Sequence, residues 1–112
     1  MFFKRKREET PEEKLDRMLT RLGERIEILE AIMFACNNYS TITNLIRESD
    51  DLKDAKENLR RTYALSDMQS QAVIDIRIKA FTKMERKKLF DECQECKAKY
   101  EELKRERISI ET

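Results

Sequence analysis

The sequence predicts an all-α protein in which two long antiparallel coiled-coil helices carry a small helical knob inserted between them. Charged residues make up 42% of the 112 residues, with one Gly and one Pro, which is a composition typical of long surface helices. Apolar residues also recur at alternating steps of four and three near both ends of the chain, as in heptad helices. No segment shows the alternation that predicts strands, and no internal repeat is present.

The chain is expected to form a single helical domain over residues 10–112, preceded by a disordered basic tail at 1–9. The first arm helix is placed at 10–38. Thr10 is suited to cap it, Pro11 fits the first helical position, and Glu13 completes a capping box. Gly23 lies inside the helix and costs about 1 kcal/mol relative to Ala. The apolar seam of this helix consists of Leu15, Leu19, Leu22, Ile26, Leu29, Met33 and Cys36.

The knob is placed at 39–81 and is predicted to contain three short helices. Two of them span about 41–48 and 52–62, and the third runs from Asp67 to Ala80 after a capping box formed by Ser66 and Gln69. Thr82 is expected to cap a returning arm helix at 82–108. The seam of that helix is spaced like the first one and consists of Leu89, Cys93, Cys96, Tyr100 and Leu103.

Five segments, in order, resemble a known family. The most specific is Gln69-Ser70-Gln71-Ala72-Val73-Ile74-Asp75-Ile76-Arg77-Ile78, followed by Thr82-Lys83-Met84-Glu85-Arg86. These are similar to the Gln-Ala-Gln-Ala-Ile-Leu-Asp-Met-Arg-Leu and Leu-Thr-Gly-Leu-Glu runs in the A subunits of DNA gyrase and topoisomerase IV. Weaker similarity covers 25–31, 42–49 and 54–59, so the resemblance extends from about Leu15 to about Leu103. Lys83 replaces the family glycine, and Glu27 replaces a family histidine.

The resemblance implies the dimer-gate segment of a type IIA topoisomerase, the C-gate, without its catalytic apparatus. In the family, two long helices form an arm carrying a knob, and two knobs meet on a two-fold axis. The family enzyme needs several hundred residues, and its nucleophilic tyrosine lies on a winged-helix domain far N-terminal of the matched segment. Tyr39, Tyr63 and Tyr100 do not correspond to that nucleophile. We therefore expect no enzymatic activity, no catalytic residue and no cofactor.

The cysteine pair Cys93-x-x-Cys96 invites a metal or redox interpretation. Metal sites of this type need further ligands, but the chain has no His and only Cys36 besides the pair. All three cysteines fall on the predicted seams, where cysteine acts as a small apolar side chain. We expect core packing, with thiol redox chemistry as the alternative, and no metal. One glycine cannot build a phosphate loop, and the carboxylates are interleaved with Lys and Arg as on a solvated surface.

The third knob helix carries apolar residues over a wide arc, more than one neighbouring helix requires. A second copy of the chain would cover the remaining side, although the knob could also enclose this helix in its own core. Asp75 and Arg77 are expected to pair with each other if both are buried. The predicted homodimer interface consists of Met68, Gln71, Ala72, Asp75, Ile76, Lys79, Phe81, Lys83 and Met84.

The formal net charge of +1 argues against the whole chain acting as an electrostatic nucleic-acid binder. A local contact with nucleic acid, weak at most, is assigned to Lys4, Arg5, Lys6 and Arg7. No apolar run approaches membrane-span length and no signal peptide is visible, so we expect a cytoplasmic protein without membrane association.

Three hypotheses for function remain open. The first is a dimerisation module that forms a homodimer or modulates a full-length gyrase or topoisomerase IV subunit by pairing with it. The second is a DNA-associated accessory protein, and the third is a degenerate gene remnant that still folds.

Overall fold

The computed structural model describes residues 7–111, and over that range all of its regular secondary structure is helical, without a β-strand. The predicted all-α class is therefore confirmed. The predicted basic tail falls largely outside the described residues, because Lys4, Arg5 and Lys6 are not among them. In chain order the elements are α1 (Pro11–Asn37), α2 (Tyr39–Glu48), α3 (Leu52–Tyr63), α4 (Asp67–Ile74), the short 3-10 helix η1 (Ile78–Phe81) and α5 (Lys83–Glu111).

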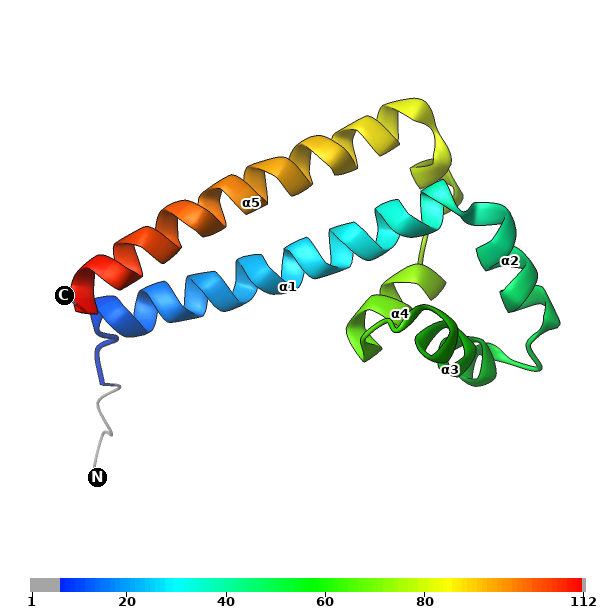
Figure 1. Cartoon of the computed structure of the whole chain (residues 1–112), viewed down its shortest axis with the longest axis horizontal. Helices are drawn as coiled ribbons and strands as arrows, with labels where there is room; N and C mark the ends of the chain where they lie inside the picture. The colour runs from blue at the N-terminus through cyan, green and yellow to red at the C-terminus, as the bar shows by residue number, and fades with distance from the viewer. Residues whose placement is uncertain (1–6, 112) are drawn as a thin grey trace, which may run out of the picture.

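The two long helices, α1 and α5, pack side by side and run in opposite directions (Figure 1). Ion pairs between α1 and α5 show which residues of the two helices lie opposite each other. Asp16 near the start of α1 bonds Arg107 near the end of α5 at 2.8 Å, and Arg25 bonds Glu92, an earlier α5 residue, at 2.6 Å. Between these pairs, a Cβ added at Gly23 would lie 3.7 Å from the ring of Tyr100. The partner on α5 thus moves backward as α1 advances.

The predicted seam residues differ in how deeply they are buried. Leu29, Cys93 and Leu103 are almost fully buried, and Cys36 is buried as well. The other seam side chains are partly exposed, as expected for two helices that shield each other on one side only; they are Leu15, Leu19, Leu22, Ile26, Met33, Leu89, Cys96 and Tyr100.

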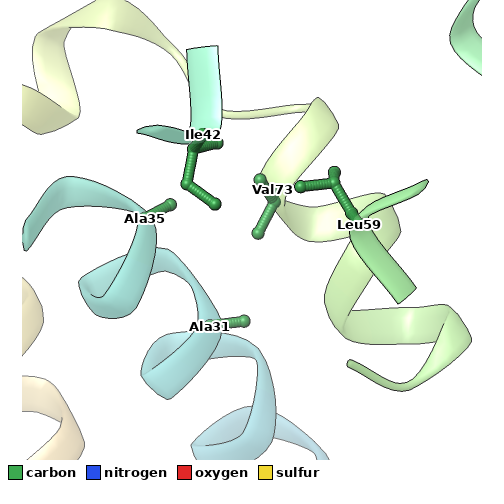
Figure 2. Close-up of a cluster of buried hydrophobic side chains, with 5 residues drawn as sticks. All are labelled: Ala31, Ala35, Ile42, Leu59 and Val73. Carbon is green, nitrogen blue, oxygen red and sulfur yellow. The ribbon is translucent and has the colours of Figure 1, made fainter. Parts of the chain in front are cut away.

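The main buried cluster lies where the knob packs on the second half of α1. Ala31 and Ala35 of α1 face Ile42 of α2, Leu59 of α3 and Val73 of α4 (Figure 2). The two alanines leave room for α4 to approach α1 closely. Phe34 and Tyr63 close one side of this cluster in an edge-on ring contact, with centroids 5.2 Å apart.

The predicted helix starts agree with the structure at three positions. Thr10 Oγ1 accepts a hydrogen bond from the Glu13 N–H at 3.1 Å, and Thr82 Oγ1 accepts one from the Glu85 N–H at 3.3 Å. Ser66 and Gln69 form the full capping box, each side chain accepting from the other's backbone N–H. These bonds satisfy amide groups that have no partner inside the helix.

The prediction of a continuous helix from Asp67 to Ala80 is wrong. α4 ends at Ile74 with Asp75 as its C-terminal cap, and the chain is extended at Arg77 before η1 begins. The segment 73–78 contains four β-branched residues, which favour extended backbone over helix. The break also has a packing benefit, because Ile74 and Ile76 both contact the buried cluster.

Candidate association surface

The nine residues predicted to form a dimer interface are divided among three places in the structure. Ala72, Asp75, Ile76 and Lys79 line one open hollow of about 560 Å³ beside α1 and α5. Isoleucines of α1 and Leu89 of α5 supply the rest of its apolar lining. Met68 and Gln71 are exposed elsewhere on α4. Phe81, Lys83 and Met84 lie at the turn into α5, at the knob end of the molecule.

Two of the exposed apolar side chains at this end are Ile78, the first residue of η1, and Met84, in the first turn of α5. Ile78 is 84% exposed and Met84 is 64% exposed, although both are large apolar residues. Ile78 was not among the predicted interface residues. The break after α4 turns it outward, whereas in a continuous helix it would lie one turn after Ile74 on the same face. The β-branched run from Val73 to Ile78 was the sequence signal that could have indicated this break.

The expected pairing of Asp75 with Arg77 is not found. Both side chains are exposed, so neither requires an internal partner. Asp75 accepts a hydrogen bond from Gln71 Nε2 at 3.1 Å across one helical turn. Both residues were predicted to lie on a buried helix. Because α4 ends at Ile74, they lie beyond its last residue and are exposed.

The three cysteines are free thiols. Cys93 is buried and Cys96 is partly exposed. The Cys36 thiol donates to the carbonyl oxygen of Ala80 at 3.6 Å, which ties the end of α1 to η1. Burial raises the pKa of Cys36, only partly offset by the positive charge of Arg86, and burial also raises that of Cys96. Within residues 7–111, no group of three or more potential acidic, Cys or His ligands is arranged to hold a metal ion.

The three tyrosines have different surroundings. Tyr63 packs on Phe34, Tyr100 lies against Gly23, and Tyr39 is 58% exposed with its ring 6.1 Å from that of Phe81. Of the four basic residues assigned to a nucleic-acid contact, Arg7 alone is among the described residues, and it pairs with Glu13 at 2.8 Å. No helix in the described part of the chain is long and apolar enough to cross a membrane.

The structure combines two long antiparallel helices, a helical knob, and exposed apolar residues at the knob end. The family model for the A subunit of DNA gyrase/topoisomerase IV matches residues 1–111. The chain therefore belongs to this family, which confirms the resemblance found in the sequence.

Individual relatives agree with this assignment. The chain is 38% identical over 77 residues to the DNA gyrase A subunit of Staphylococcus aureus strain NCTC 8325 and 31% identical over 77 residues to that of Leptospira biflexa; each match covers 69% of this chain and 9% of the relative. It is 38% identical over 71 residues to the DNA gyrase A subunit of Campylobacter fetus, covering 63% of this chain and 8% of the relative. The chain thus spans less than a tenth of the length of these curated relatives.

Proposed function

We propose that this chain is a non-catalytic association module that forms a two-fold homodimer through its knob end, as the C-gate does in the family. In this proposal, residues 10–38 and 82–108 are the two halves of a coiled-coil arm. Residues 39–81 form the knob that carries the contact.

The coiled-coil arm is supported by the buried seam and by its flanking charges. Three residues of the predicted seams, Leu29 of α1 and Cys93 and Leu103 of α5, are almost fully buried. The ion pairs Arg25–Glu92 and Asp16–Arg107 join the same two helices at the edge of this seam. Such exposed pairs contribute little stability, but they favour one register over others.

The observation that carries the dimer proposal is the exposure of Ile78 and Met84 at 84% and 64%. Covering one such side chain is worth roughly 1.5–3 kcal/mol. A two-fold contact buries each side chain twice, once from each copy. Val73 is buried in the knob core and Ile74 and Ile76 pack against it, so these three residues of the predicted arc offer less surface to this contact.

The non-catalytic part of the proposal is supported by the surroundings of the tyrosines. Tyr63 packs on the ring of Phe34 in the knob, and Tyr100 of α5 lies beside Gly23 of α1. Tyr39 shares a hollow with Arg86, but no carboxylate lines that hollow to hold a metal ion. Cleavage of DNA by a tyrosine in this family context needs both an activating neighbour and metal-binding carboxylates.

Light scattering at micromolar concentration tests the homodimer. We expect the native chain to be a dimer and Ile78→Glu to be a monomer, because two like charges would be placed in one desolvated contact. Leu52→Glu is the matched control, since Leu52 of α3 is also an exposed apolar residue. A monomeric native chain, or equal loss of dimer in the Leu52 variant, would disprove the proposal.

The same contact would allow the chain to pair with a full-length A subunit from its own family. Co-expression of the tagged chain with such a protein tests this extension. Recovery of the full-length protein with the native chain, and its loss with Ile78→Glu, are the expected results. Equal recovery with both forms would show that the knob end is not the contact.

A further inference from the structure

The positive charge of the chain is concentrated at the knob end. Six of the 24 basic residues, but one of the 23 acidic residues, fall within residues 77–88. The remainder of the chain is therefore net negative, even though the whole chain is nearly neutral. All six of these basic side chains are exposed. The net charge of +1 therefore does not reflect the uneven distribution of basic and acidic residues along the chain.

The first two turns of α5 carry much of this charge against the helix's own electrostatic preference. Cations near a helix N-terminus are unfavourable, because the amide dipoles already make that end positive. The first turn of α1 contains Glu12 and Glu13 and that of α4 contains Asp67, as this rule favours. α5 instead begins at Lys83 and continues through Arg86 and Lys87, with Glu85 as the acidic exception. The helix dipole therefore does not favour cations at these positions.

Lys83, Arg86, Lys87 and Phe90 are spaced i, i+3, i+4 and i+7, so they occupy one face of α5. Phe90 is 49% exposed on that face. Lys87 bonds Asp91 at 3.2 Å, an exposed pair within one helix that is weak and easily exchanged. Arg86 makes no ion pair with any acid in residues 7–111.

Arg86 joins two adjacent hollows. One, of about 360 Å³, is lined by Arg86, Cys36, Tyr39 and Phe81. The other, of about 160 Å³, is lined by residues that include Arg86, Cys36 and Phe90. Arg86 therefore shares one hollow with the exposed aromatic side chain of Tyr39 and the other hollow with that of Phe90.

We propose that this face, formed by Tyr39, Phe81, Lys83, Arg86, Lys87 and Phe90, binds single-stranded nucleic acid. Cations spaced along one helix face suit successive phosphates, and exposed aromatic rings provide surfaces on which unpaired bases stack. A duplex keeps its bases stacked on each other and offers only its phosphates to these rings. An acidic protein segment would use the cations but would leave the aromatic rings without a matching partner.

The proposed binding does not depend on the homodimer. Phe81 and Lys83 belong to both the proposed face and the predicted dimer interface, whereas Tyr39, Arg86, Lys87 and Phe90 belong to the face alone. Variants at these positions are therefore expected to lose nucleic acid while remaining dimeric. Loss of both properties together would contradict the separation of the two surfaces.

The most direct probe is Phe90→Trp, because the chain has no other tryptophan. Titration with an oligothymidylate of about 12 nucleotides should quench its fluorescence as a base stacks on the indole. If Lys83, Arg86 and Lys87 each contact one phosphate, binding should weaken as salt is added. A plot of the logarithm of the binding constant against the logarithm of the salt concentration should have a slope of about −2. Arg86→Gln should make that slope shallower by about 0.7.

Fluorescence anisotropy with a labelled oligothymidylate completes the test. Phe90→Ala should weaken binding about tenfold, as loss of one stacked base does. Lys53→Gln, which removes an exposed cation on α3, is the control and should bind as the native chain does. Circular dichroism should show the same helix content in all variants. No binding at about 50 mM salt would overturn the proposal. Equal affinity for duplex DNA or polyglutamate, or no effect of Phe90→Ala, would do so as well.

Discussion

Replacing Gly23 by Ala is expected to stabilise the protein. Gly23 lies in the interior of α1, where glycine is less favourable than alanine by about 1 kcal/mol. The new methyl group would lie 3.7 Å from Tyr100 Cε2 of α5, which is an ordinary van der Waals contact. No clash therefore has to be subtracted, and the expected gain is about 1 kcal/mol in the free energy of unfolding.

Thermal unfolding followed by circular dichroism measures this gain. For a domain of this size, about 1 kcal/mol corresponds to a rise in Tm of roughly 4–8 °C. Chain concentration has to be held constant, because association shifts Tm. Ala98→Gly, on an exposed position of α5, is the reciprocal control and should lose a similar amount.

A larger side chain at the same position tests the packing itself. Gly23→Leu should remove the gain, since its extra atoms would overlap the ring of Tyr100. A loss of stability in Gly23→Ala would refute the reasoning. It would mean that α1 and α5 approach more closely at Gly23, or that they pack in a different register.

Three further changes have defined outcomes. Ala64→Gly should raise the free energy of unfolding by about 1 kcal/mol in urea titrations, because Ala64 ends α3 in the left-handed region with φ of 53°; no gain would contradict that backbone conformation. Leu59→Ala should lower it by roughly 2–5 kcal/mol, since Leu59 is fully buried in the knob core; a loss near zero would place Leu59 outside the core. The hydrogen bond from Lys56 lowers the pKa of Asp67 below its ordinary value of 3.8. The ionised Asp67 therefore adds a small stabilisation to the folded protein, which is complete above pH 3.8 and is lost as the pH falls through the lower pKa of the folded state. Asp67→Asn should therefore be less stable than native at pH 7, with the difference vanishing in strong acid, and a difference independent of pH would contradict this.

The arms and the helix starts were predictable because their signals are local and repeated. The seams of α1 and α5 recur over several heptads, so an error at one residue does not change the prediction. The side-chain caps at Thr10, Ser66 and Thr82 depend on residues within one turn of each other. Heptad spacing and helix caps therefore form in the folded chain largely independently of the tertiary contacts around them.

The end of α4 was not predictable from the same patterns. The run from Val73 to Ile78 presents apolar residues in a way that a helix would also explain. Its actual conformation is decided by packing of Ile74 and Ile76 against the knob core, a long-range effect. The end of α3 was predicted to within one residue, although Ala64 takes the left-handed position that usually requires Gly or Asn.

The candidate surface was predicted in part. Met84 was identified and is exposed, whereas Ile78 was missed because it was placed on a helix that does not exist there. The basic and aromatic face of α5 was also missed. Its members come from α2, η1 and α5, so only the folded chain places Tyr39 and Phe90 on either side of Arg86.

Photocrosslinking tests the proposed two-fold contact most directly. A benzoylphenylalanine at position 84 lies at the knob end of α5, and one at position 108 lies near the free end of the arm; the native side chains there are 64% and 52% exposed. The chain is 54 Å along its longest axis, so the two positions report on different ends of the molecule. We expect covalent dimers from position 84 and none from position 108. Covalent dimers from position 108 alone, or from neither position, would contradict association through the knob.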